Sequence, residues 1–156
     1  MEIRRKAVLR PPFENYYICV MSRILAVDYG TKRIGLAVTD PLQISVNGLP
    51  TQSQANYWAF LETYILEEDV GKVVLGYPEH ADGAPTALYP HIKGLARKLK
   101  KNFPELQLVL HPEDYTSKRA SEIILKAGVN KKQRREKERI DKISAVLILQ
   151  DYLGHI

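Results

Sequence analysis

The chain has 156 residues, of which 45% are hydrophobic and 26% charged, and a formal net charge of +5. This length allows one domain with its own core, and the composition excludes a disordered chain. The apolar runs fall far short of the roughly 18 residues that a membrane-spanning helix needs, so we expect no membrane contact. A single cysteine, Cys19, excludes an internal disulfide and predicts a reducing, cytoplasmic location.

Residues 1–21 are predicted to be an N-terminal extension outside the fold, which leaves one domain over residues 22–156. The stretch MEIRRKAVLRPPFENYYICV starts with basic residues, but Pro11, Pro12 and the polar FENYY interrupt any apolar segment. It is therefore a poor signal peptide. Met21 directly precedes SRILAVDYG, and we expect it to be the true or an alternative start.

The rest of the chain reads as a hairpin followed by alternating strands and helices. Strands over 23–28 and 33–39 are joined by a short turn that contains Gly, and a third strand is expected over 43–51. The later elements are expected as a helix over 55–68, a strand over 72–78, a helix over 86–101, a strand over 106–114, a helix over 116–127 and a helix over 140–153. This order predicts a mixed sheet with helices on its faces.

Three carboxylates stand where folding alone does not require them. Asp28 interrupts the first apolar strand, and Glu113 follows the apolar run LQLVLH. Asp141 lies near the start of the last helix, on an otherwise apolar side. Each also has an ordinary explanation: a turn residue, a loop residue, or an acid that favours the helix dipole.

As a set, the three carboxylates suggest a metal site. Functional groups of open α/β sheets gather outside the C-terminal ends of the strands, where Asp28 and Glu113 are expected. Asp141 could join them from a flanking helix. Three carboxylates repel each other unless a cation lies between them, and hard oxygen ligands select Mg²⁺ or Mn²⁺. Two such ions would support hydrolysis of a phosphodiester bond.

At this point the sequence resembles a known family. RILAVDYGTKRIGLAVTD closely resembles the opening motif of the YqgF/RuvX family, ribonuclease-H-like proteins described as Holliday junction resolvase-like and as nucleases of pre-16S ribosomal RNA. Three more segments are similar to segments of that family: VVLGYPEHADGAPT, HPEDYTSKRASEIIL and RIDKISAVLILQDYL. The resemblance covers about residues 22–153.

The resemblance implies an α/β, ribonuclease-H-like fold: a mixed five-stranded sheet of order 3-2-1-4-5, with strand 2 antiparallel, flanked by helices. It implies Asp28, Glu113 and Asp141 as catalytic and metal-binding acids, with Mg²⁺ or Mn²⁺ as cofactor. One departure is that Pro112-Glu113-Asp114 stands where the family usually has Asp-Glu-Arg.

The activity that the resemblance implies is a metal-dependent endonuclease, acting in 5′-end maturation of pre-16S rRNA during ribosome biogenesis. The alternatives are a Holliday junction resolvase that acts on branched DNA, or a non-catalytic RNA-binding relative. The expected partners are pre-rRNA or branched DNA, and ribosomal particles. The protein would act as a monomer or a homodimer.

Basic residues around the predicted acids favour contacts with a nucleic-acid backbone over a merely solvated surface. They are Lys32, Arg33, Lys118, Arg119, Lys131, Lys132, Arg134, Arg135 and Arg139. No aromatic ladder accompanies them in the sequence, so stacking of a single strand is not indicated.

An ATP-binding module is a competing interpretation of the first motif. DYGTKRIGLAV also resembles the first phosphate motif of actin-like kinases, a hairpin whose backbone amides hold phosphate. Those proteins need two such domains and a second Gly-rich loop, whereas this chain has the length of one domain.

Overall fold

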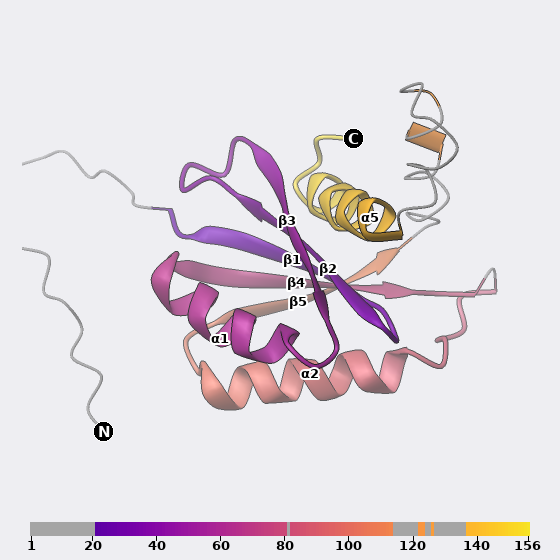
Figure 1. The fold of residues 1–156 in the computed structure, drawn as a ribbon, viewed down its shortest axis with the longest axis horizontal. Coiled ribbons are helices and arrows are strands. Elements are labelled where there is room, and N and C mark those ends of the chain that lie inside the picture. The colour runs from indigo at the N-terminus through magenta and orange to yellow at the C-terminus, as the bar shows by residue number, and fades with distance from the viewer. Residues whose placement is uncertain (1–20, 81, 114–121, 124–125, 127–136) are drawn as a thin grey trace, which may run out of the picture.

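The computed structural model describes residues 21–156 except 81, 114–121, 124–125 and 127–136. Within that part, one sheet has the order β3-β2-β1-β4-β5 (Figure 1). Its strands are β1 (Arg23–Tyr29), β2 (Arg33–Thr39), β3 (Val46–Ser53), β4 (Val70–Pro78) and β5 (Gln107–Glu113). β2 is antiparallel to both of its neighbours, while β1, β4 and β5 run parallel. This confirms the predicted sheet.

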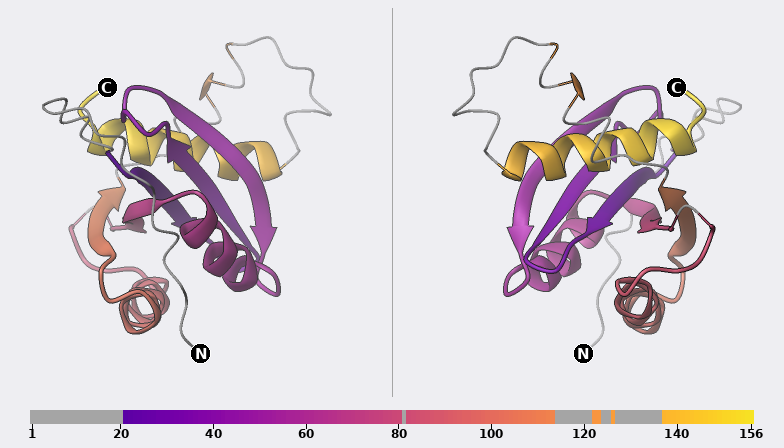
Figure 2. Two further views of the ribbon diagram at one scale, coloured as in Figure 1. Left: turned by 90° about the vertical axis from the view of Figure 1, so that its left-hand side faces the viewer. Right: turned by 90° about the vertical axis from the view of Figure 1, so that its right-hand side faces the viewer.

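Helices cover both faces of the sheet. α1 (Tyr57–Glu67) and α2 (Tyr89–Asn102) pack on one face, and α5 (Lys137–Tyr152) lies across the other (Figures 1 and 2). The predicted extension over residues 1–20 and most of the helix expected over 116–127 lie outside the described residues. In the part of the chain that is described, no helix is both long enough and apolar enough to span a membrane.

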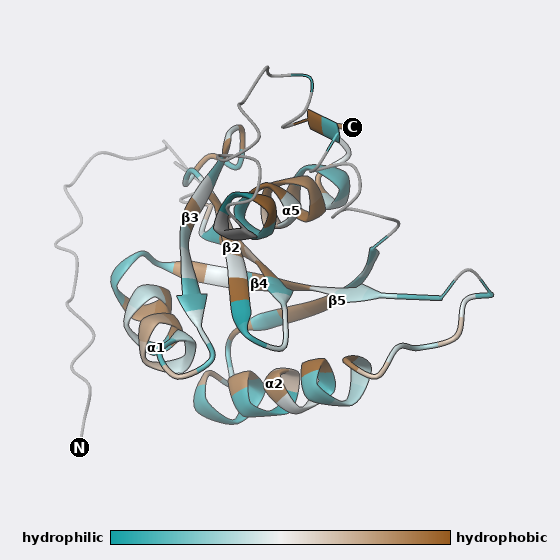
Figure 3. Cartoon of the chain, turned by 45° about the vertical axis from the view of Figure 1, so that its right-hand side comes forward, coloured by the Kyte–Doolittle hydropathy of each residue, from teal (hydrophilic) through white to brown (hydrophobic). Residues whose placement is uncertain are grey.

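Each face of the sheet has its own hydrophobic core, because successive side chains of a strand point to opposite faces. The core under α1 and α2 includes Leu25 and Val27 of β1, together with Leu61 and Leu99 of the helices. Figure 3 shows the apolar side of α2 turned toward the sheet. The core under α5 includes three small side chains, Ala26, Ala37 and Ala145. Small residues let α5 lie close to the strands.

The helix ends differ slightly from the sequence prediction. α2 begins at Tyr89 rather than at residue 86, which puts Pro90 in its first turn, where the missing N–H costs no hydrogen bond. In α1, Leu61 and Ile65 are buried, but Leu66, which has the same helical spacing in the sequence, is 60% exposed. The apolar stripe of α1 is therefore narrower than the sequence suggests.

Asp40 explains why β3 starts later than predicted, at Val46 rather than at residue 43. Its carboxylate accepts hydrogen bonds from the backbone N–H groups of Leu42, Ile44 and Ser45. These bonds, that from Ser45 first, lower the pKa of Asp40. The residues before Val46 are thus held in a turn, because their N–H groups point at Asp40 and not at β2.

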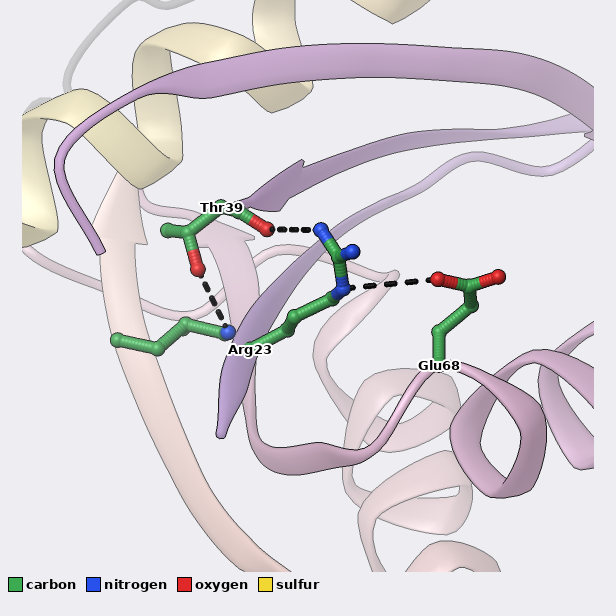
Figure 4. Close-up of polar contacts among 4 residues, drawn as sticks. Arg23, Thr39 and Glu68 are labelled. Atoms are coloured by element: carbon green, nitrogen blue, oxygen red, sulfur yellow. Dashed lines mark hydrogen bonds and ion pairs between the residues drawn. The ribbon is translucent and has the colours of Figure 1, made fainter. Parts of the chain in front are cut away.

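The beginning of β1 is fixed by polar contacts far from Asp28 (Figure 4). Arg23 Nη1 donates to the Thr39 carbonyl oxygen at 3.1 Å, and its Nε lies 3.5 Å from Glu68 Oε2. The fully buried Thr39 hydroxyl accepts the N–H of Ile24 at 2.9 Å. These contacts tie β1 to the end of β2 and to the turn after α1. None of these contacts involves the other end of β1, where Asp28 lies.

Candidate active site

The predicted acids come together at one edge of the sheet. Asp28 is the second-last residue of β1, and Glu113 is the last residue of β5. Both strands run parallel to β4, which lies between them, so their carboxyl ends meet at the same edge. α5 lies on the face of the sheet opposite α1 and α2. It brings Asp141 close enough for its charge to act on Asp28. The structure thus brings Glu113 and Asp141, from distant parts of the sequence, close enough to Asp28 for their charges to act on it.

The Asp28 carboxyl is the electrostatic centre of this cluster. Burial, first of all, raises its pKa well above the ordinary value of 3.8. The negative charges of Glu113 and Asp141 raise the pKa further, as does a hydrogen bond between the Asp28 and Glu113 side chains. Two carboxyl groups can share a hydrogen bond only if one of them carries a proton. The negative charges around Asp28 therefore favour positive charge at this place.

Two glycines make room for these carboxylates. Gly35 of β2 and Gly76 of β4 are the residues paired with Asp28 on either side. A Cβ atom on Gly35 would overlap the backbone carbonyl of Asp141, so this glycine lets α5 approach the sheet. A Cβ atom on Gly76 would overlap the carboxyl group of Glu113. The missing side chains leave the space beside Asp28 to its acidic neighbours.

Arg33 fixes the third carboxylate. Its Nε donates to Asp141 Oδ2 at 2.7 Å, and the two side chains are 32% and 26% exposed. Asp141 lies beyond the first turn of α5, which extends at least from Lys137, so the helix dipole does not account for its position. The ion pair connects the beginning of β2 directly to the acidic cluster.

Comparisons with known proteins show which family the chain belongs to. Residues 22–155 match the family described as "RuvX: Holliday junction resolvase". The chain belongs to the RuvX family. A relative from Amoebophilus asiaticus is 44% identical over 134 residues, which cover 86% of this chain and 95% of the relative. One from Porphyromonas gingivalis is 44% identical over 135 residues, 86% of this chain and 98% of that one. Both are named "Putative pre-16S rRNA nuclease".

The predicted resemblance is thereby confirmed, and the chain stands in a family of nucleases. A third relative, from Flavobacterium psychrophilum, carries the same name and is 43% identical over 133 residues. That alignment covers 85% of this chain and 97% of the relative.

The chemistry of the acidic cluster in this RuvX protein suits a divalent cation. Its carboxylate oxygens are hard ligands, and a cation would offset the negative charges of Glu113 and Asp141 that raise the pKa of Asp28. Among the described residues, no three Asp, Glu, His or Cys side chains lie close enough together to hold one metal ion in their present positions. Asp141 is paired with Arg33, so a metal ion would compete with Arg33 for this carboxylate.

We therefore expect Arg33→Gln to strengthen metal binding in the absence of nucleic acid. The substitution removes a cation that competes for Asp141, so the affinity for Mn²⁺ should rise by roughly threefold or more. Isothermal titration of the nucleic-acid-free protein with Mn²⁺ measures this. Arg97→Gln, at an exposed position of α2, is the matched control and should leave the affinity unchanged. Unchanged or weaker binding by Arg33→Gln would show that the ion pair does not restrain Asp141.

The predicted nucleic-acid contacts are placed only in part. Lys32 is exposed in the β1–β2 turn, and Arg139 is exposed on α5, two residues before Asp141. Arg33, from the same prediction, is engaged with Asp141. The other predicted residues lie outside the described part of the chain: Lys118, Arg119, Lys131, Lys132, Arg134 and Arg135.

Sequence reasoning missed the two glycines. A glycine inside a strand indicates a close approach by another part of the molecule, and both Gly35 and Gly76 interrupt apolar strands. That signal was available in the sequence. It also missed the contact of His111 with α5, where its Nε2 lies 2.7 Å from Asp151 Oδ2. This pair links β5, two residues before Glu113, to the end of the helix that carries Asp141.

Proposed function

We propose that this RuvX protein is a metal-dependent endonuclease that hydrolyses phosphodiester bonds in the maturation of the 5′ end of pre-16S rRNA. It would act in the cytoplasm, on ribosomal particles or their RNA. The observation that carries the proposal is the convergence of Asp28, Glu113 and Asp141 at one sheet edge. The RNA substrate is supported by the names of relatives that are 43–44% identical and aligned over nearly their whole length.

The residues of the proposed site would have different roles. Asp28, Glu113 and Asp141 would hold Mg²⁺ or Mn²⁺, which supplies activation of the attacking water and stabilisation of the leaving oxygen. Asp28 would give up its proton when the ion binds. Arg33 pairs with Asp141 in the metal-free protein and would release this carboxylate when the ion binds. Lys32 and Arg139 are exposed, precede Arg33 and Asp141 by one and two residues, and would contact backbone phosphates.

A side-by-side cleavage assay tests the proposal. The purified protein is incubated with Mg²⁺ or Mn²⁺ and either an RNA that carries the 5′ leader of 16S rRNA or a four-way DNA junction. We expect cleavage of the RNA that stops when the metal is chelated. Preferential cleavage of the junction would favour the resolvase alternative. A resolvase cuts two strands and needs two sites, so it would also have to be a dimer in solution.

The non-catalytic alternative makes a different prediction. Pro112 stands where the family usually has an acid, and this departure could weaken the cluster beside Glu113. A protein without activity would bind RNA in a salt-sensitive way but would leave both substrates intact with either metal. That outcome would refute the proposed nuclease activity.

A further inference from the structure

A hollow of about 430 Å³ opens beside the β1–β2 turn. Its walls are formed by Tyr29 of β1, Thr31 of the turn, Gln54 after β3, and Leu88 and His91 at the start of α2. Tyr29 directly follows Asp28, and successive side chains of a strand point to opposite faces. The hollow and the acidic cluster therefore flank the same strand end, one on each face of the sheet.

The hollow is an aromatic platform assembled from separate parts of the chain. The rings of Tyr29 and His91 are nearly parallel, at 9°, with centroids 6.4 Å apart. Tyr57 meets the Tyr29 ring edge-on, at 89° and 6.0 Å. The sequence showed no aromatic ladder because these three residues are brought together only by the fold.

Tyr29 is held in place by its neighbours before any ligand arrives. Its hydroxyl lies 3.4 Å from Gln54 Oε1, and Gln54 in turn donates from Nε2 to the carbonyl oxygen of Gly30. A ring fixed in this way loses little conformational freedom on binding. Tyr29 and His91 both keep part of their surface in solvent, so a planar ligand can reach them.

The lining favours a neutral planar group over a phosphate. The residues that line the hollow in the described part of the chain include no Lys, Arg, Asp or Glu. The Thr31 hydroxyl and the Gln54 amide can serve the polar edge of a nucleobase, and the rings can stack on its face. The volume is sufficient for one base.

We propose that this hollow binds an unpaired nucleobase of the substrate strand, close to the phosphate that is cleaved. The inference rests on the proposed nuclease function and narrows its substrate. Bases inside a duplex are stacked and cannot enter a side pocket, so the hollow selects a single-stranded or frayed RNA segment. The strand would cross the β1–β2 turn past the exposed Lys32.

Binding without cleavage tests the hollow separately from the activity. The affinity for a labelled single-stranded oligoribonucleotide and for an RNA duplex is measured by fluorescence anisotropy in EDTA. Tyr29→Leu and His91→Ala should each weaken single-strand binding at least about fivefold and leave duplex binding unchanged. His91 is exposed, so its variant is expected to fold normally. Phe60→Leu removes a ring from the stacked Phe60–Tyr64 pair of α1 and serves as the matched control.

Photocrosslinking gives an independent readout. An oligoribonucleotide with 5-iodouridine should crosslink to Tyr29 or His91, as located by mass spectrometry of the peptides. Unchanged affinity of both variants, or equal losses on single strand and duplex, would overturn the inference. If the wild type binds RNA through Tyr29 but cleaves nothing, the proposed nuclease function is wrong and the proposed base-binding role of the hollow is supported. If both variants cleave as well as the wild type and no crosslink forms, the nuclease function is kept and the base-binding role of the hollow is refuted.

Discussion

Replacing Asp28 by Asn will abolish metal-dependent cleavage and, at the same time, raise the thermal stability of the metal-free protein. Asn keeps the shape of the side chain but cannot ionise. Burial and the charges of Glu113 and Asp141 make the ionised Asp28 carboxylate unfavourable in the folded state, which is why its pKa is raised. Each unit of such a rise corresponds to about 1.4 kcal/mol against the charged form. We expect a gain of at least about 2 °C in melting temperature near pH 8.

The pH dependence of this gain has a definite sign. A carboxyl whose pKa is raised by folding contributes stability below its unfolded pKa, near 3.8, and loses that contribution as pH rises through the folded pKa. The stability difference between Asp28→Asn and wild type should therefore be small near pH 4 and should grow toward neutral pH. Thermal denaturation in EDTA across this range measures it. A variant that is less stable than wild type at neutral pH would contradict the electrostatic argument.

Two further measurements complete this experiment. Added Mg²⁺ or Mn²⁺ should stabilise the wild type by binding the folded state and should have little effect on Asp28→Asn. Asp40→Asn is the matched control, because the pKa of Asp40 is lowered by backbone hydrogen bonds, that of Ser45 first. Loss of the Asp40 carboxylate should lower the stability of the protein, whereas Asp28→Asn should raise it. Asp40→Asn should leave cleavage intact. Cleavage that survives in Asp28→Asn would remove Asp28 from the active site.

The strands of the sheet could be predicted from local patterns, whereas their order was implied by the resemblance to the family. The hairpin of β1 and β2 follows from two apolar runs around a short turn, and β4 and β5 are apolar runs of the kind that buried parallel strands show. Once these strands are parallel, Asp28 and Glu113 must lie at the same edge. The partial burial of Asp141 follows from its position on the side of α5 that also carries Ala145 and Ile148.

The remaining features depend on contacts between distant segments. The ion pair of Arg33 with Asp141 joins residues 108 positions apart, and nothing in either segment specifies it. The Tyr29–His91 platform likewise requires that α2 begin beside the β1–β2 turn. The late start of β3 results from side-chain bonds of Asp40 that compete with the β2–β3 ladder. Patterns of hydrophobicity carry no information about such specific polar and aromatic pairs.

Substitutions of the two glycines on either side of Asp28 should have different effects: one mainly on stability and the other mainly on cleavage. In Gly35→Ala, the new Cβ meets the backbone of Asp141, which cannot yield unless α5 moves away from the sheet. We expect a loss of on the order of 2 kcal/mol in the free energy of unfolding, measured by urea denaturation. In Gly76→Ala, the new Cβ meets the ends of the Glu113 and Ile148 side chains. These ends can rotate, so the loss of stability should stay below about 1 kcal/mol.

The catalytic effect of Gly76→Ala should nevertheless be large, because Glu113 can relieve the overlap only by leaving its position beside Asp28. A misplacement of about 1 Å in a reacting group costs on the order of a hundredfold in rate, and we expect a loss of that size in cleavage by a folded protein. Gly94→Ala is the control: it has no atom within 4 Å of the new Cβ and should stabilise α2 by about 0.5–1 kcal/mol without affecting cleavage. Full activity in Gly76→Ala would mean that Glu113 functions from another position than the one it occupies here.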